Sequence, residues 1–264
     1  MDPHVPEPRM RGPRVDPWAG RRKLLAVADV QTGYHHDSIS HALATIERLG
    51  RDSGEYIANI RTDSQLITRA GIVGQGPKYG GKPVNARNLG EYDALFLLPS
   101  GEGTMSPEQK ADLLGFVHDD GKGLLIGHAG ILAFQQWPEF AEMAGARFGG
   151  EFAGPATVRV EDPTFPGADA FGAEMFTFDD QHPILKEPYD RDRVDVIMSL
   201  DPASVDPRHR ERRPDGDFPV VWTHRYGKGR VCNLGWGHLD TTWDDPRFQQ
   251  MILGAIRWAM GPGA

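Results

Sequence analysis

The chain has 264 residues, of which 39% are hydrophobic and 25% are charged, and its formal net charge is -8. These values predict a globular protein that is long enough to bury a substantial core. The negative charge argues against nucleic acid as a partner, because phosphate binding requires a basic surface. No apolar stretch is long enough to cross a bilayer, so we expect no membrane partner either.

The cysteine count and the N-terminal segment indicate the compartment. Cys232 is the only cysteine, which excludes an internal disulfide and fits a reducing environment. It lies in a predicted strand, where a packed thiol is expected rather than a nucleophile. Residues 1–21 are rich in proline and arginine and lack the apolar segment of a secretory signal, so we interpret them as a disordered or loosely draped arm. We therefore expect a cytoplasmic protein.

Short apolar runs alternate with helical patterns in the first half of the chain. Strands are expected at 23–29, 56–60, 94–98 and 123–126, helices at 39–49, 106–121 and 131–143, and a long loop at 71–90. Asp37 and Ser38 are candidate caps of the first of these helices, and Gly50 is its expected end. Strands that alternate with helices are typical of a mostly parallel sheet with helices on both faces.

The second half has a different pattern, with repeated glycine and proline. We expect a β-rich insertion at about 147–193, with short strands such as 157–160, folded at the edge of the sheet. The elements expected after it are strands at 194–200 and 218–223, a hairpin that joins 220–223 to 231–234, and a helix at 246–260. Residues 22–264 are thus predicted to form a single α/β domain.

Histidines follow three of the apolar, strand-like runs. His35 and His36 come after the first run, His128 directly follows 124–127, and His238 follows 231–237. In an open α/β sheet, ligands bind outside the carboxyl ends of the strands. If these runs are neighbouring parallel strands, histidines that are distant in sequence meet in one cleft. This placement is the strongest indication of a functional site.

Three segments together resemble a known family. Residues 33–38 (GYHHDS), 121–129 (GKGLLIGHA) and 218–238 are similar to elements of the ThuA-like (trehalose utilisation) family, and the resemblance extends over about 23–261. The fold of that family is similar to the class I glutamine amidotransferase scaffold. The resemblance therefore implies a flavodoxin-like, mostly parallel sheet. It also implies carbohydrate chemistry on trehalose and related disaccharides, partly through keto-sugar intermediates.

The chain departs from these relatives at two places. Amidotransferases of this scaffold carry a cysteine at the turn where this chain has His128 and its neighbours, and without a thiolate we expect no glutaminase activity. The family often has an Asp-Glu-x-Tyr-like element where this chain reads Asp179-Asp180-Gln181-His182. Because His182 replaces the tyrosine, we expect a different substrate preference.

Candidate roles follow from side-chain chemistry and from the resemblance. His128 and His238 are the expected proton shuttles, because imidazole titrates near working pH, and Asp179 would orient them or share that task. His36 would bind substrate hydroxyls or a metal. The further substrate-binding candidates are His35, Glu102, Asp180, Trp236 and Asp240. For Trp236 the sequence leaves two interpretations open: the side chain stacks on a sugar ring, or it packs in the core.

The leading expectation is an enzyme, an isomerase, lyase or hydrolase, that acts on a small-molecule sugar or keto-sugar without a cofactor. A divalent metal such as zinc, held by His36, His128 and His238 with Asp179, is the alternative for the site. Two other functions stay open: a non-catalytic carbohydrate-binding or regulatory module, and a metal-dependent hydrolase with a non-sugar substrate. The sequence decides neither the substrate nor whether copies of the chain form a homo-oligomer.

Overall fold

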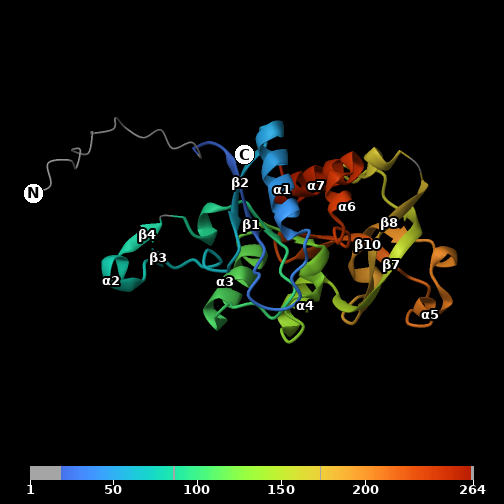
Figure 1. Cartoon of the computed structure of the whole chain (residues 1–264), viewed down its shortest axis with the longest axis horizontal. Coiled ribbons are helices and arrows are strands. Elements are labelled where there is room, and N and C mark those ends of the chain that lie inside the picture. The colour runs from blue at the N-terminus through green and yellow to red at the C-terminus, as the bar shows by residue number, and fades with distance from the viewer. Residues whose placement is uncertain (1–18, 86, 173, 263–264) are drawn as a thin grey trace, which may run out of the picture.

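A nine-stranded mixed sheet runs through the protein, and helices cover both of its faces (Figure 1). The structure is a computed structural model that describes residues 19–85, 87–172 and 174–262. Most of the predicted N-terminal arm lies outside these residues. The strand order is β2-β1-β5-β6-β11-β10-β9-β7-β8.

The first five strands in this order are parallel to one another and form the half of the sheet that carries the histidines. They are β1 (Arg22–Val27), β2 (Tyr56–Arg61), β5 (Ala94–Leu97), β6 (Gly123–Gly127) and β11 (Gly229–Leu234). β5 and β6 are buried along their whole length. Parallel strands that are covered on both faces are apolar at consecutive positions rather than at alternate ones. This is why the sequence pattern predicted them, and the expected strands are confirmed.

The other four strands continue the same sheet in antiparallel fashion. They are β10 (Pro219–Tyr226), β9 (Asp195–Leu200), β7 (Arg147–Val160) and β8 (Met175–Lys186). The predicted hairpin of β10 and β11 is confirmed, with Tyr226 paired to Gly229 across a two-residue turn. β7 and β8 are much longer than the short strands expected from the sequence. The length of β7 was underestimated because Gly149, Gly150 and Gly154 interrupt its alternation of apolar and polar residues.

Helices from distant parts of the chain cover the two faces. α1 (Ile39–Ser53) and α7 (Pro246–Met260) share one hydrophobic core with alternate residues of β1, including Leu24 and Ala26. α3 (Pro107–His118) and α4 (Pro138–Ala144) share the other with Leu25 and Val27. Figure 1 shows the two pairs on opposite sides of the strands. The expected α/β architecture with helices on both faces is thus confirmed.

Three predicted helices have other bounds, and one of them, α3, ends at His118 rather than at 121. Gly50 does not end α1, which continues to Ser53 and is capped by Gly54 in the left-handed conformation (φ 72°). The helix expected at 131–143 is instead a short 3-10 helix, η2 (His128–Leu132), followed by α4. The segment between them contains Phe134, which has a positive φ of 54°. Pro138 starts α4, because proline suits a first helical position and restricts the residue before it to extended conformations.

The remaining elements are short. They are β3 (Ile72–Val73), α2 (Gly76–Tyr79), β4 (Pro83–Asn85), α5 (Pro207–Arg210), α6 (Asp240–Asp244) and the 3-10 helices η1 (Leu89–Glu91), η3 (Ala168–Phe171), η4 (Arg191–Arg193) and η5 (Pro202–Ser204). The region expected to be one long loop, 71–90, thus contains a two-stranded hairpin, which projects from the main sheet in Figure 1. Within the described residues, we find no helix with the length and hydrophobicity needed to cross a membrane.

Candidate functional site

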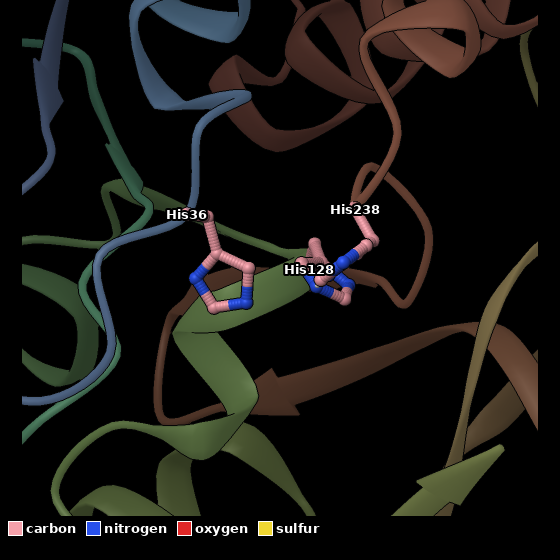
Figure 2. Close-up of side chains that lie close together, drawn as sticks. All are labelled: His36, His128 and His238. Atoms are coloured by element: carbon pink, nitrogen blue, oxygen red, sulfur yellow. The ribbon is translucent and has the colours of Figure 1, made fainter. Parts of the chain in front are cut away.

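Three imidazole rings meet at the carboxyl ends of β1, β6 and β11. His36 lies in the loop after β1, His128 begins η2 directly after β6, and His238 lies in the loop after β11 (Figure 2). One ring nitrogen from each histidine lies within 4.8 Å of the others. The ring centroids are 4.9 Å apart for His36 and His128, and 5.2 Å apart for each pair that includes His238. The convergence expected from the sequence is therefore present.

The loop that carries His36 is held against the loop after β5. The buried Asp29 carboxylate accepts hydrogen bonds from the Thr104 backbone N–H at 3.2 Å and from its hydroxyl at 2.9 Å. Gly33 has a φ of 77°, and a Cβ atom there would lie 2.6 Å from the backbone nitrogen of Gly101. Only glycine allows this conformation and this approach of two backbones. The two contacts together fix the direction in which the chain enters His36.

The loop that carries His238 is organised by a buried carboxylate. Asp180 accepts hydrogen bonds from the backbone N–H groups of Gly237 at 2.9 Å, His238 at 3.1 Å and Gln181 at 2.6 Å, and from the Thr242 hydroxyl at 2.6 Å. Burial raises the pKa of Asp180 above its ordinary value, and these hydrogen bonds oppose the rise. Two of these donors are the backbone N–H groups of Gly237 and His238, so Asp180 fixes the backbone at His238.

Ser38 joins the loop of His36 to the loop of His238. Its hydroxyl donates to the Gly237 carbonyl at 2.9 Å. Ser38 does occupy the position before α1, but its side chain makes no capping hydrogen bond to the helix. The expected capping role of its side chain is therefore wrong, because the hydroxyl is used to tie two site loops together.

Hydrogen bonding and burial define the protonation of the cluster. His128 Nδ1 lies 3.3 Å from the Gly235 carbonyl oxygen, which can only accept, so Nδ1 carries the proton and Nε2 has a free lone pair. That Nε2 lies 3.2 Å from His238 Nδ1. Burial, and then the neighbouring His36, lower the pKa of His128 to about 3. Burial, and then His238, lower the pKa of His36 to about 4. Both rings are therefore neutral at pH 7.

His36 is the least satisfied member of the cluster. Its ring is buried, and its Nδ1 has no hydrogen-bond partner among the described residues. The ring of Tyr34 stands edge to face with it, with centroids 4.9 Å apart. Tyr34 itself is 66% exposed. Two neutral, buried imidazoles, those of His36 and His128, thus lie next to an aromatic ring that is exposed at the surface.

Three predicted site residues have other positions. Asp179 is exposed, and within the described residues no hydrogen bond joins it to a histidine of the cluster. Asp180 is buried and saturated by protein donors, so it is not available to a substrate. Trp236 is fully buried and packs on Phe178, with ring centroids 4.4 Å apart. Of the two readings for Trp236, the core one is therefore confirmed.

The remaining candidates lie outside the cluster. His35 is exposed, whereas its neighbour His36 is buried, since adjacent residues of this turn face opposite sides. Glu102 is exposed and accepts hydrogen bonds from the Gln136 backbone N–H at 3.2 and 3.3 Å. Asp240 is exposed at the first position of α6. Within the described residues, none of the three contacts the histidine cluster through a hydrogen bond.

His182 and Cys232 are core residues. His182 accepts a hydrogen bond from the Trp236 indole at 3.0 Å and donates to the Gly154 carbonyl at 2.9 Å, and its ring is fully buried. The His182 ring therefore faces the core and does not line the histidine cluster, and its effect on substrate preference stays a prediction. Cys232 is also fully buried, and burial raises the pKa of its thiol, which confirms the expected packed cysteine.

Sequence reasoning missed Gln181 and Glu151. The Gln181 side-chain amide lies 3.0 Å from His238 Nε2, and its other end reaches the Glu151 carboxylate. Gln181 could have been considered from the sequence, because it lies within the Asp179–His182 element that was compared with the family. Glu151 had no signal in the sequence, because its nearness to Gln181 depends on the pairing of β7 with β8, which places Glu151 opposite Pro183.

Comparisons with known proteins agree with this fold. The family model described as ThuA, trehalose utilisation, matches residues 24–259. A ThuA-like protein from Bacteroides uniformis superposes with a TM-score of 0.67 at 20% identity, over 90% of this chain and 91% of the other. One from Parabacteroides merdae gives 0.65 at 17% identity, over 91% and 90%. A cytoplasmic protein from Salmonella typhimurium gives 0.54 at 13% identity, over 90% and 98%. A search of curated proteins finds no match.

Proposed function

The chain belongs to the ThuA, or trehalose utilisation, family, and on this premise we propose that it is an enzyme that acts on a sugar or keto-sugar at the His36–His128–His238 cluster. The observation that carries the proposal is the meeting of three imidazoles, two of them neutral and buried, at the carboxyl ends of three parallel strands. The order of the five parallel strands, β2-β1-β5-β6-β11, supports a flavodoxin-like sheet. The cluster then lies beside the point where that order reverses, where such sheets bind ligands.

A divalent metal ion such as zinc fits this cluster. Two imidazole nitrogens bound to one zinc ion at about 2.05 Å lie roughly 3.3 Å apart in a tetrahedral site, and the nitrogens of His128 and His238 lie 3.2 Å apart. The unpartnered polar atom of the buried His36 also fits a site that a ligand completes. Three protein ligands and an open position are typical of catalytic zinc rather than structural zinc.

The low pKa values favour a role as ligands over a role as proton shuttles. A general acid must be in its protonated form at working pH, but a pKa of about 3 keeps the His128 ring neutral. Its one remaining proton, on Nδ1, is donated to the Gly235 carbonyl. A metal ligand, in contrast, must be deprotonated, so burial prepares His36 and His128 for that task. When bound, the ion would supply a Lewis acid that polarises a carbonyl or hydroxyl oxygen of the substrate.

The surroundings of the cluster support a carbohydrate as the substrate class. Tyr34 presents an exposed aromatic ring directly beside His36. Pyranose rings have an apolar face, and an exposed aromatic side chain next to polar groups offers a surface for such a ligand. Tyr34 thus takes the stacking role that one reading of the sequence gave to Trp236. The cytoplasmic location stays a prediction.

Turnover assays with matched variants test the proposal. Purified protein, with zinc and after chelation, is incubated with trehalose, related disaccharides and their keto derivatives, and products are followed by chromatography. We expect turnover by the zinc-loaded protein and loss of at least about 100-fold in His128→Ala. His118→Ala, which removes an exposed histidine at the end of α3, serves as the control. Wild-type protein that binds these sugars but converts none of them would favour a non-catalytic module and contradict the proposal.

A further inference from the structure

The Gln181 side chain bridges Glu151 and the third histidine of the cluster. One end of the Gln181 amide lies 2.8 and 3.1 Å from the two carboxylate oxygens of Glu151, and the other end lies 3.0 Å from His238 Nε2. Glu151 is on β7 and Gln181 on β8, diagonal neighbours in the paired strands. The two residues and His238 therefore form a hydrogen-bonded chain that ends at the cluster.

The chemistry of these groups gives the chain a direction. Burial raises the pKa of Glu151, and the nearby His238 opposes the rise. As a carboxylate, Glu151 only accepts hydrogen bonds, and the Gln181 amide meets both of its oxygens when its NH2 group faces Glu151. The amide oxygen then faces His238, and it needs a proton on His238 Nε2. When His238 carries a single ring proton, on Nε2, a lone pair is free on Nδ1, the atom that faces His128.

The consequence is that two lone pairs face each other across 3.2 Å. His128 Nε2 is unprotonated because its other nitrogen donates to the Gly235 carbonyl. If the Gln181 amide were reversed, His238 would carry its proton on Nδ1 and donate it to His128. The N–H group at His238 Nδ1 would then donate a hydrogen bond to His128 Nε2, and the lone pair of that atom would not be available to a metal ion.

We propose that Glu151 is a positioning residue that, through the Gln181 amide, holds His238 in the tautomer that keeps the three-histidine cluster open for a divalent metal ion. Partners that fix the tautomer of a metal-binding histidine are typical of such sites, and their loss costs roughly 10–100-fold in metal affinity. This inference rests on the proposed function for its metal, but the tautomer itself can be measured without one.

Two variants test the direction of the hydrogen-bonded chain. In Glu151→Gln, residue 151 can donate as well as accept, so the Gln181 amide is free to reverse. In the double variant Glu151→Gln/Gln181→Glu, the new carboxylate accepts directly from His238 Nε2, and the original direction is restored. Zinc affinity is measured by competition with a chromophoric chelator, and the His238 tautomer by 15N NMR of the metal-free protein. Circular dichroism checks that each variant is folded.

We expect Glu151→Gln to bind zinc roughly 10–100-fold more weakly than wild type and the double variant to recover to within a few fold. The metal-free wild type should show a proton on His238 Nε2. Equal zinc affinity in Glu151→Gln and wild type, a double variant as weak as the single one, or a wild-type proton on Nδ1 would overturn the inference. If wild type binds no zinc, the metal part of the proposed function fails, whereas the NMR result still decides whether Glu151 sets the tautomer.

Discussion

Replacing Asp180 by asparagine tests whether a buried carboxylate holds the His238 loop. Asp180 accepts four hydrogen bonds, two at each oxygen. Asparagine has one acceptor oxygen, so its NH2 group must face one pair of these donors. If the NH2 group faces Thr242 and Gly237, the Thr242 hydroxyl can turn to accept, but the Gly237 N–H loses its partner.

The expected cost follows from this count. A buried N–H without an acceptor costs about 1–3 kcal/mol, and the hydrogen bonds that remain lose the charge that strengthens them. The neutral amide avoids the desolvation of a buried carboxylate, which offsets part of this loss. We therefore expect Asp180→Asn to lower the free energy of unfolding by about 2–3 kcal/mol. For a chain of this size, that is a decrease in Tm of roughly 5–10 °C.

Urea unfolding and thermal melts measure the effect, and Asp179→Asn is the matched control. Asp179 is the preceding residue on the same strand, but it is exposed, so its variant should stay within about 0.5 kcal/mol of wild type. Zinc affinity should also fall in Asp180→Asn, because the backbone at His238 loses an anchor. Equal stability of Asp180→Asn and wild type would refute the role given to this carboxylate.

Three further predictions concern the cluster and its surroundings. Tyr34→Ala should raise KM for a sugar substrate roughly fivefold with little change in kcat. Tyr79 is a similarly exposed tyrosine near the projecting hairpin, and Tyr79→Ala should change neither constant. An unchanged KM in Tyr34→Ala would argue against stacking of the sugar on Tyr34. His36 and His128 have pKa values of about 4 and 3 in the folded state but 6.5 in the unfolded state, so the unfolded state binds protons first as the pH decreases. The free energy of unfolding of the metal-free protein should therefore fall as pH decreases from 6.5 to about 3. In chemical denaturation, His128→Gln should show a shallower fall than wild type, and identical slopes would contradict the assignment. Trp236→Phe should lower the free energy of unfolding by about 2–3 kcal/mol, because packing and the indole hydrogen bond to His182 are lost. Its zinc affinity, measured by chelator competition, should equal that of wild type. Weaker zinc binding by the folded variant would count against a purely core role for Trp236.

The sequence predicted most of the fold because buried parallel strands and glycine or proline boundaries leave local signals. β5 and β6 were found as continuous apolar runs. β7 was not, because glycines interrupt its pattern and its partner β8 lies beyond a connection of 14 residues. α4 begins at Pro138, which is visible in the sequence, whereas the positive φ of Phe134 in the segment before it is not.

Site residues that follow the end of a strand could be predicted from the sequence. Site residues whose position depends on how two strands pair were missed. His36, His128 and His238 could be placed because each follows the end of a predicted strand. The choice between Asp179 and Asp180 depends on which face each residue takes, and a shift of one residue exchanges the faces. Glu151 acts through the pairing of two distant strands, and no local pattern reports such a pairing.

The amount of metal bound by the histidine cluster tests the central claim most directly. Metal-free protein is dialysed against zinc, and the bound ion is measured by elemental analysis for wild type, His128→Ala and His35→Ala. We predict one zinc ion per chain for wild type and for His35→Ala, and close to none for His128→Ala. A wild-type protein that retains no zinc, or a His128→Ala variant that retains as much as wild type, would contradict the account.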